Sequence, residues 1–423
     1  MGLPENYSLA PLDESRLRDV IALDSWAFPT GLSLETLLTL PQPLDWERTA
    51  GITRSASMEL AAMHTAYSLR AYPVPGAEVA CGWLSWVGVH PGHRRRGLLR
   101  AMIEHHLADV RARGENISAL FAAEPAIYGR FGYGLAATQL TLTLSRGAAL
   151  RPVPGSAELP IELTVWDADT HADEIGALHR DYASLPEGVG RPGWAHWETP
   201  ELAASRNADP VEYREKKEAL RLLVVRDTDS SALAYARFRR TERWGRGGPE
   251  GTVVVTDAVA HTPAAAHRMW SVLLDLDLMS TCKSHMLTLD DPLLSLLVDI
   301  RAAQPDYQDN TWLRIVDLPA ALSERRYSAV ADVVLEITDA LIPENAGRWR
   351  VQATAGAHAL VERSTAEPDL SLDIRELGSA HLGSVSLAAL AQSGLGTVHR
   401  PEALRAAASA WSWPVSAGVD WIF

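Results

Sequence analysis

The segment from residue 78 to residue 114 constrains the fold of this chain more than any other part of the sequence. Residues 78–89 are mostly apolar and contain two tryptophans, which predicts a buried strand. A basic loop follows, and residues 98–110 then carry apolar side chains at helical spacing until Gly114 ends the pattern. A strand that leads directly into a long amphipathic helix predicts an α/β domain.

A second copy of this strand–loop–helix unit is predicted in the middle of the chain. Residues 252–260 are apolar and β-branched, and residues 264–279 carry an apolar helical stripe. A His followed closely by a Pro opens the helix in both units, which indicates an internal duplication. The tetrapeptide Arg94-Arg95-Arg96-Gly97 of the first unit is replaced by Ala266-His267-Arg268-Met269 in the second. We therefore expect the second copy to lack the basic loop.

The chain divides into three predicted domains. Its 423 residues suggest two or three domains of about 150 residues each. Residues 151–160 contain three prolines and a Gly-Ser pair, which is typical of a linker. From residue 311 onward, strands and helices follow in an α+β order unlike that of the first two blocks. We expect domains at residues 1–150, 151–310 and 311–423, and a fold class of α/β plus α+β.

The charge balance limits the kinds of partner. The net charge is −14, from 39 basic and 53 acidic residues. An acidic surface repels phosphates and anionic lipids, so neither nucleic acid nor a membrane is an expected partner. No stretch is long and apolar enough for a transmembrane helix, and the first residues do not resemble a signal peptide. Cys81 and Cys282 are expected to be buried free thiols, which favours a reducing, cytoplasmic location.

The basic loop suits a bound anion such as the pyrophosphate of coenzyme A. Unpaired N–H groups and the positive end of the helix dipole lie at the start of a helix. Gly97 lets the main chain approach a phosphate closely, and Arg94, Arg95 and Arg96 add forked positive charges. The strand residues 87–89 can pair with an extended pantetheine arm as with another strand. A solvated surface cluster of arginines remains the alternative on the residues alone.

The same loop resembles the acetyl-CoA signature R/Q-x-x-G-x-G/A of the GNAT superfamily of N-acetyltransferases. Residues 94–98 fit this signature, whereas Leu99 replaces the last small residue. HRRRGLLRAM at 93–102, EPAIYGRFGYG at 124–134 and WLRIVDLPAAL at 312–322 more closely resemble the enhanced intracellular survival (Eis) family. The resemblance therefore touches all three predicted domains in order.

This resemblance implies tandem GNAT domains, the second degenerate, followed by a sterol-carrier-protein-like domain. It implies acetyl-CoA as co-substrate, a homohexamer, and a small-molecule amine acceptor such as an aminoglycoside, or a protein lysine. The expected acetyl-CoA-binding residues lie on the strand, on the loop and after the following strand: Val87, Gly88, Val89, Arg94, Arg95, Arg96, Gly97, Leu98, Leu99, Arg100, Ala123 and Glu124.

For catalysis, the resemblance implies direct acetyl transfer with two groups that handle protons. Tyr128 occupies the family's position for the general acid, and the terminal carboxylate of Phe423 is the expected general base. A backbone N–H near Val89 is the expected polariser of the thioester carbonyl. On the residues alone, a core role for Tyr128 and a tail that packs only for stability remain the alternatives.

The acceptor amine is expected to meet aromatic and acidic side chains. Trp26, Phe28 and Trp86 occupy positions where the family has aromatic walls, and aromatic faces suit cationic amines. Asp24 and Asp45 are candidate acidic anchors because they lie near these positions in the sequence. Ile422 stands where several relatives carry an acidic residue beside the terminus.

A metal site and a carrier function are the remaining alternatives. No Cys or carboxylate completes a ligand set with His90, His93, His105 and His106 at suitable spacing, so no metal is expected. The third domain resembles a lipid carrier, which leaves a non-catalytic protein that binds an apolar ligand or a partner as the rival function. Binding of acetyl-CoA would separate the two.

Overall fold

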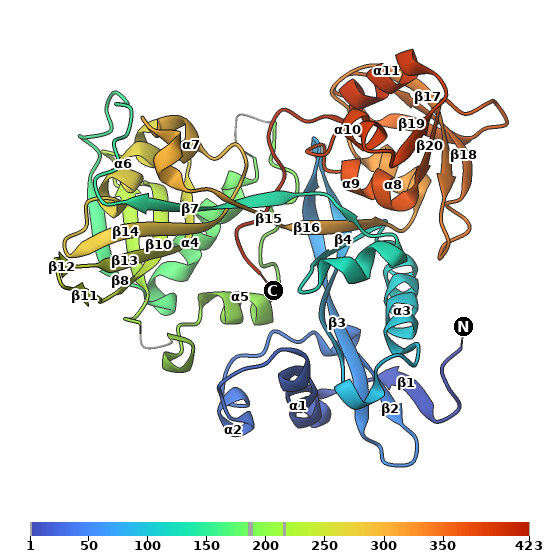
Figure 1. Cartoon of the computed structure of the whole chain (residues 1–423), viewed down its shortest axis with the longest axis horizontal. Coiled ribbons are helices and arrows are strands. Elements are labelled where there is room, and N and C mark those ends of the chain that lie inside the picture. The colour runs from blue at the N-terminus through green and yellow to red at the C-terminus, as the bar shows by residue number, and fades with distance from the viewer. Residues whose placement is uncertain (1, 185–188, 215–216, 423) are drawn as a thin grey trace.

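Two seven-stranded sheets and one five-stranded sheet form the framework of the molecule (Figure 1). The computed structural model describes residues 2–184, 189–214 and 217–422. The first sheet lies in the blue lobe, the second in the green and yellow lobe, and the third in the orange and red lobe. The predicted order of two α/β units followed by an α+β unit is confirmed.

The first sheet has the strand order β1-β2-β3-β4-β5-β16-β6. Its first five strands and its last are β1 (Tyr7–Pro11), β2 (Ala50–Arg54), β3 (Leu60–Val74), β4 (Ala77–Val89), β5 (Ile117–Phe121) and β6 (Gly134–Leu135), and its helices are α1 (Leu17–Ala27), α2 (Leu34–Leu37) and α3 (Leu98–Ala112). Strand β4 runs antiparallel to β3 and parallel to β5. The predicted apolar stripe of α3 is buried and packs on this sheet.

The second sheet has the order β15-β7-β14-β13-β10-β9-β8. Its strands are β7 (Thr138–Ser145), β8 (Ile161–Val165), β9 (Arg221–Arg226), β10 (Ala232–Thr241), β13 (Gly251–Ala260), β14 (Met279–Leu287) and β15 (Asp306–Asp309), and its helices are α4 (Ala168–Tyr182), α5 (Pro200–Asn207), α6 (Pro263–Leu273) and α7 (Pro292–Leu296). Strand β13 is antiparallel to β10 and parallel to β14, which repeats the arrangement around β4.

Helix α6 ends at Leu273, so the prediction that it reaches residue 279 is wrong. Leu278 has a left-handed φ of 65°, and the next residue, Met279, pairs with Gly251 as the start of β14. Leucine and aspartate alternate over residues 274–278, and such a short apolar pattern fits a helix end, a turn or a strand. Pairing with β13 decides between them.

The first two sheets exchange strands across the centre of the molecule. Strand β7 follows β6 in sequence, but it lies in the second sheet between β15 and β14. Strand β16 (Thr311–Ile315) follows the second sheet in sequence, yet it lies in the first sheet between β5 and β6. Figure 1 shows both strands running between the lobes. The predicted boundary at residue 310 therefore falls immediately before a strand of the first sheet.

The third sheet has the order β19-β18-β17-β20-β21. Its strands are β17 (Ala331–Thr338), β18 (Gly347–Ala353), β19 (Ala359–Arg363), β20 (Leu370–Asp373) and β21 (Gly396–Val398), and its helices are α8 (Leu318–Glu324), α9 (Ile374–Ala380), α10 (Leu387–Gln392) and α11 (Pro401–Trp411). One buried cluster joins Trp83 of the first sheet to Leu335 and Trp411 of the third unit. The first and third units therefore share a core.

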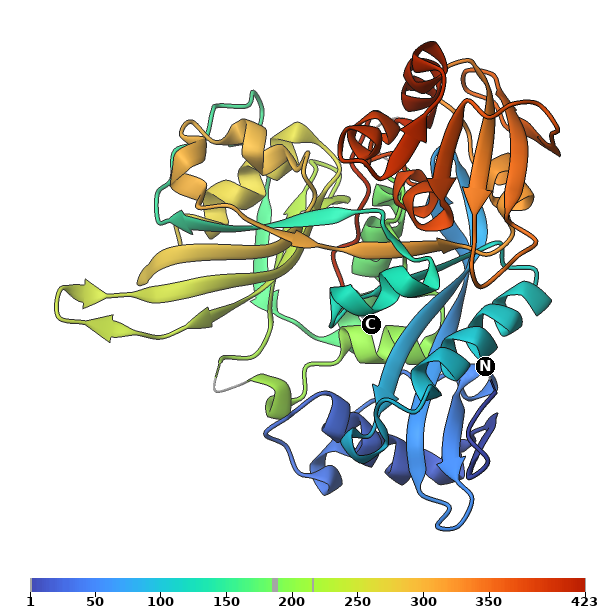
Figure 2. The ribbon, with the colours of Figure 1, turned by 45° about the vertical axis from the view of Figure 1, so that its right-hand side comes forward.

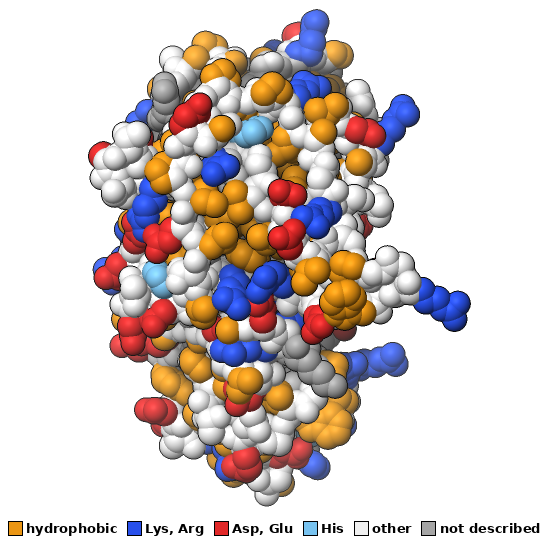
Figure 3. All heavy atoms as spheres, turned by 90° about the vertical axis from the view of Figure 1, so that its left-hand side faces the viewer, with side chains coloured by type: hydrophobic (Ala, Val, Ile, Leu, Met, Phe, Trp, Pro, Cys, Tyr) orange, Lys and Arg blue, Asp and Glu red, His pale blue; other side chains and the backbone are white. Residues whose placement is uncertain are grey.

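The second lobe presents a mixed outer surface. Its hairpin β11–β12 (Trp244–Gly245 with Gly248–Pro249) extends away from the molecule (Figure 2). Figure 3 shows basic and acidic side chains interspersed over this face, with apolar side chains between them. Within the described ranges, none of the helices is long and apolar enough to cross a membrane.

Candidate active site

The edge of β4 becomes free where β4 and β5 separate. The two parallel strands pair only through residues 81–84 and 117–120. Strand β4 continues to Val89, and no described strand pairs with this last part on the β5 side. Free N–H and C=O groups on a strand edge can hydrogen-bond an extended ligand as an added strand. The predicted residues Val87, Gly88 and Val89 all lie on this open edge.

A β-bulge bends β4 at the start of the open edge. Trp86 has a left-handed φ of 53°, and Trp86 and Val87 together oppose the single residue His64 of β3. A bulge of this kind increases the local twist and redirects the side chains of the strand. Strands β4 and β5 separate directly after their last pair, Leu84 with Leu120, and the bulge accounts for this separation.

The loop between β4 and α3 presents N–H groups to solvent. Arg95 and Gly97 have φ values of 61° and 81°, so the backbone turns in the left-handed region twice within three residues. Helix α3 has no side-chain cap at Gly97 and no acidic residue in its first turn. The N–H groups of Leu98, Leu99 and Arg100 therefore lack partners within the helix, which makes the helix start an anion-binding position.

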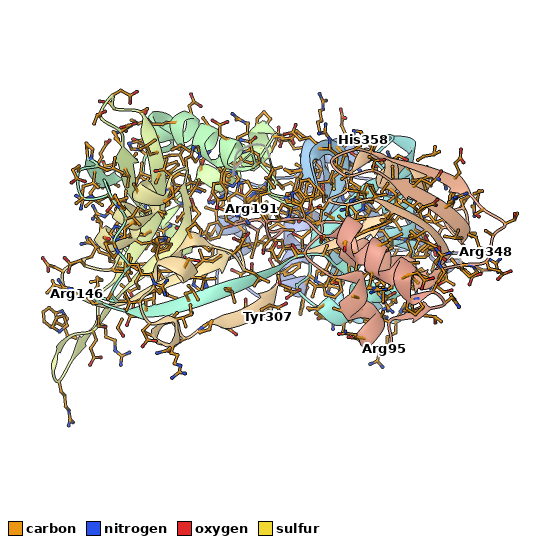
Figure 4. The ribbon with its side chains drawn as sticks, turned by 90° about the horizontal axis from the view of Figure 1, so that it is seen from above. Arg95, Arg146, Arg191, Tyr307, Arg348 and His358 are labelled. Atoms are coloured by element: carbon orange, nitrogen blue, oxygen red, sulfur yellow. The ribbon has the colours of Figure 1, made fainter. Side chains whose placement is uncertain are left out.

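The three loop arginines have different contacts. Arg96 donates to the Tyr7 hydroxyl at 2.9 Å and to the carbonyl of Gly92 at 3.3 Å. Arg94 and Arg95 are exposed, and neither has a hydrogen bond or ion pair with a described residue. Figure 4 shows the Arg95 side chain on the outside of the molecule. Arg96 therefore anchors the loop, whereas Arg94 and Arg95 remain available to a bound anion.

Two further predicted residues follow the neighbouring strand. Ala123 and Glu124 come directly after β5 and are exposed. Because β4 and β5 are parallel, their carboxyl ends lie at the same edge of the sheet. The residues predicted to bind acetyl-CoA thus come together on both sides of one opening. Arg100 is an exception, because it forms an ion pair with Glu104 at 3.2 Å.

Tyr128 borders the inner end of this opening. It lies in the short 3₁₀ helix Pro125–Phe131, is 8% exposed, and packs in one apolar cluster with Leu84 and Leu120, the last paired residues of β4 and β5. Its hydroxyl has no hydrogen-bond partner among the described residues and is not sealed from solvent. Burial raises the pKa of Tyr128 to about 12, so the hydroxyl stays protonated at neutral pH.

Helix α1 approaches the open edge of β4 at Gly88. A Cβ built on Gly88 would lie 3.3 Å from the Ala27 Cβ, so the absence of a side chain at Gly88 permits this close packing. Trp26 and Phe28, at the end of α1, are 62% and 42% exposed. The Trp26 ring lies 5.1 Å from the ring of His90, which follows β4. Two of the three predicted aromatic residues therefore present exposed rings near the end of β4.

Trp86, the third predicted aromatic residue, has a more structural position. Its ring is half-buried and packs beside helix α1, against the clusters that contain Leu23 and Ile21. Its indole N–H donates to the Tyr67 hydroxyl at 3.1 Å, and Tyr67 in turn donates to the Pro43 carbonyl. Trp86 therefore links β4 to the loop before β2 and packs against α1.

The two candidate acidic anchors differ in their contacts. Asp24 of α1 is half-buried, and no described residue forms a hydrogen bond or ion pair with its carboxylate. Burial alone raises the pKa of Asp24 to about 6. Asp45 instead accepts the backbone N–H of Glu47 at 3.0 Å and caps the turn Trp46–Arg48. Asp24 is thus the carboxylate that remains available to a cation.

The last described residues follow α11 of the third unit and reach the first sheet at β4. Trp421 packs edge-on against Trp83 of β4 at 5.3 Å and donates its indole N–H to the Ala195 carbonyl at 2.8 Å. Trp83 is next to Leu84, where β4 and β5 separate. The predicted base, the carboxylate of Phe423, lies outside the described residues.

Glu59, His90 and His93 bring possible metal ligands within 4.8 Å of one another. However, His93 Nδ1 contacts the Tyr7 hydroxyl at 2.8 Å, and His90 Nδ1 accepts the N–H of Gly92 at 3.2 Å. The adjacent arginines also make the local field positive, which disfavours a cation. These contacts favour a role in shaping the loop, and the absence of a metal stays a prediction.

Sequence reasoning missed Tyr7 and Glu59, which contact the loop from other elements, and the contact between His179 of α4 and Asp420 of the tail. Tyr7 and Glu59 reach the loop from β1 and from the residue before β3. No local motif marks them, because their partners are far away in sequence. Asp420 carried one signal, as a single acidic residue in an apolar tail.

Three segments of the chain match known domain families. Residues 8–136 and residues 190–315 each match an acetyltransferase (GNAT) domain family. Residues 318–417 match the sterol carrier protein domain family. These matches agree with the two α/β units and the α+β unit described above.

Relatives match along most of the chain. An uncharacterised N-acetyltransferase of Streptomyces avermitilis is 38% identical over 84% of each chain. N-acetyltransferase Eis of Mycobacterium tuberculosis is 33% identical over 75% of each chain. The crystal structure of Eis1 from Mycobacterium abscessus superposes with a TM-score of 0.80 at 29% identity, covering 99% of this chain and 100% of that one.

Proposed function

Because the chain belongs to the Eis family of GNAT N-acetyltransferases, we propose that it acetylates amines of a polycationic, aminoglycoside-like acceptor by direct transfer from acetyl-CoA. The observation that carries this proposal is the open edge of β4, which leads into a loop whose Arg94 and Arg95 pair with no described residue. The edge offers backbone groups to the pantetheine arm, and the loop and the start of α3 offer N–H groups and charge to the diphosphate.

In the proposed reaction, the amine nitrogen attacks the thioester carbonyl carbon while a backbone N–H near Val89 polarises the carbonyl oxygen. The C–N bond forms and the C–S bond breaks. The departing thiolate takes a proton from the Tyr128 hydroxyl, and the amine proton passes to the terminal carboxylate of Phe423. The protonated state of Tyr128 at neutral pH supports its part in this scheme. The packing of Trp421 against Trp83 supports the part of the tail.

Asp24 supports a cationic acceptor. A half-buried carboxylate with no partner among the described residues is unfavourable, and its raised pKa expresses that cost. A cationic amine of the acceptor would supply the missing partner, and the exposed rings of Trp26 and Phe28 would pack against other parts of a polyamine. We therefore assign Asp24 as the acidic anchor for an acceptor ammonium group that does not react.

The test is CoA release from acetyl-CoA across a panel of amines. The panel holds kanamycin-type and neomycin-type aminoglycosides, linear polyamines and a lysine-rich peptide. Release that depends on one amine class, and that falls strongly in Tyr128→Ala, would support the scheme and identify the acceptor class. No release with any member, under saturating acetyl-CoA, would exclude these acceptors.

The match of residues 318–417 to a sterol carrier domain favours a second candidate, a non-catalytic carrier of an apolar ligand or partner. Under this alternative, the protein binds fatty acids or sterols and shows no affinity for acetyl-CoA. Titration with acetyl-CoA and with a fluorescent fatty acid separates the two, because each candidate predicts binding of one ligand only.

We further propose that the enzyme is a cytoplasmic homohexamer. Edge strand β8 exposes an alternating apolar row, Ile161, Leu163 and Val165, which supports association between copies of the chain. Cys81 and Cys282 are buried and free, as suits a reducing compartment. Light scattering during size-exclusion chromatography would measure the mass of the assembly, and a monomer would contradict this part of the proposal.

A further inference from the structure

Hydrogen bonds hold the last residues where they pass from the third unit to the first sheet. Gly418 donates its N–H to the Pro192 carbonyl at 3.1 Å. The Asn310 side chain both donates to and accepts from the backbone of Val419, at 2.9 and 3.2 Å. Figure 4 shows Arg191 near the middle of the molecule, and its guanidinium donates to the Ser416 carbonyl at 2.7 Å. Hydrogen bonds to the backbone of residues 416–419 therefore hold the tail up to Val419.

Asp420 is held by a different kind of contact. Its carboxylate is 6% exposed and lies 2.9 Å from Nε2 of His179, a fully buried residue of α4. The other carboxylate oxygen has no hydrogen-bond partner among the described residues. Arg206, which pairs with Asp257, lies near enough for its charge to stabilise Asp420. His179 therefore makes the hydrogen bond to the Asp420 side chain.

Arg180 and Asp420 lie at the two ends of a series of hydrogen bonds through His196 and His179, and they fix which atom donates in each bond. Arg180 can only donate, so His196 Nε2 must accept from it at 3.2 Å. His196 then carries its proton on Nδ1 and donates to His179 Nδ1, also at 3.2 Å. This leaves the His179 proton on Nε2, from which it donates to Asp420. The His196 imidazole is neutral at neutral pH, which agrees with its pKa, lowered by burial to about 3.

We propose that this chain of bonds, from Arg180 through His196 and His179 to Asp420, is a latch that fixes the tail beside the open edge of β4. His179 is then a positioning residue for the base. This inference rests on the proposed function, in which the terminal carboxylate accepts the amine proton. Trp421, the next residue, is held between Trp83 of the first unit and Trp197 of the second, at 5.3 and 6.0 Å. After loss of the latch, the chain beyond Val419 would be held by these ring contacts and by the Trp421 indole bond to the Ala195 carbonyl.

The test uses the full-length protein and two readouts. In His179→Ala we expect kcat to fall by about tenfold or more with an unchanged KM for acetyl-CoA, because a small displacement of a reacting group has effects of this size. Digestion with carboxypeptidase, followed by intact mass, should proceed past Trp421 in the variant and stop earlier in the wild-type protein. His171→Ala, on the same helix α4, is the matched control and should behave as wild type.

A conservative variant keeps the test independent of folding. A glutamine at position 179 has a donor near the position of Nε2, so His179→Gln should restore much of the activity and the resistance to carboxypeptidase. Resistance of His179→Ala to digestion would overturn the latch, whatever its activity. A released tail with unchanged kcat would keep the latch but contradict the proposed role of the terminal carboxylate.

Discussion

At the level of single residues, Asp24 combines an effect on stability with a proposed role in acceptor binding. Its folded pKa of about 6 lies above the value of an unfolded Asp, so the ionised form destabilises the protein above pH 6, and this effect disappears as the pH falls below about 4. Removal of the charge in Asp24→Asn should therefore raise the free energy of unfolding at pH 8 by about 1–2 kcal/mol, after allowance for solvent screening.

The same Asp24→Asn variant should bind its acceptor less well. Loss of a charged hydrogen-bond partner predicts a rise of about tenfold in the acceptor KM, with the acetyl-CoA KM unchanged. Denaturant unfolding at pH 8 and pH 4 and steady-state kinetics measure the two effects. Asp45→Asn is the matched control, since asparagine also caps a helical turn, and its acceptor KM should not change. An unchanged acceptor KM in Asp24→Asn would remove Asp24 from the site.

Tyr128→Phe removes only a hydroxyl group. Because this hydroxyl has no partner among the described residues, stability should hardly change, whereas kcat should fall about 100-fold if it is the general acid. The neighbouring Tyr133 gives the matched control. Its buried hydroxyl contacts Ser118 at 2.8 Å, so Tyr133→Phe should lower stability by about 1 kcal/mol and leave kcat nearly unchanged. Equal kinetics in the two variants would contradict the assignment of Tyr128.

At the level of elements, the loop between β4 and α3 is the proposed binding position of the diphosphate. The double substitution Arg94→Ala/Arg95→Ala should raise the KM for acetyl-CoA about tenfold or more, because it removes two charges that have no other described partner. The KM for acetyl-pantetheine, which lacks the diphosphate, should stay the same. Arg111→Ala, near the other end of α3, serves as the control. A parallel rise for both thioesters would show that the arginines act on the fold instead.

The elements show which parts of the fold the sequence could predict. The strand–loop–helix unit at residues 78–114 depends on local periodicity and a glycine stop, and the structure confirms it. The end of α6 could not be predicted, because alternating Leu and Asp fit several structures until β14 pairs with β13. The grouping of Tyr7 and Glu59 around His93 was equally hidden, since it needs strand pairing between distant segments.

At the scale of the whole molecule, the exchange of β7 and β16 was beyond sequence reasoning. Their patterns predict strands but do not specify the sheet to which each strand belongs. The exchange has a consequence for fragments cut at the expected boundaries. Residues 1–150 alone lack β16, which lies between β5 and β6, and carry β7 without its partner strands.

We therefore expect the fragment 1–150 to aggregate or remain largely unfolded when it is produced alone. Co-expression with residues 151–423 should restore a soluble complex. Strand β7 of the first piece would then pair with β14, and β16 of the second piece would pair with β5. Solubility and circular dichroism of the fragment, with and without its partner, measure this. A well-folded fragment 1–150 would mean that β16 is dispensable for the first sheet.

Acetyl transfer from acetyl-CoA to a polycationic amine is the main activity proposed for this chain. Its most direct test is a mass balance: the CoA released and the acetyl groups gained by a kanamycin-type or neomycin-type acceptor, measured in the same reaction by thiol titration and mass spectrometry. We predict equal amounts of both, and neither product without enzyme. Bound acetyl-CoA with no acetylated acceptor would contradict the proposed acceptor class, and no binding of acetyl-CoA at all would contradict the proposed activity itself.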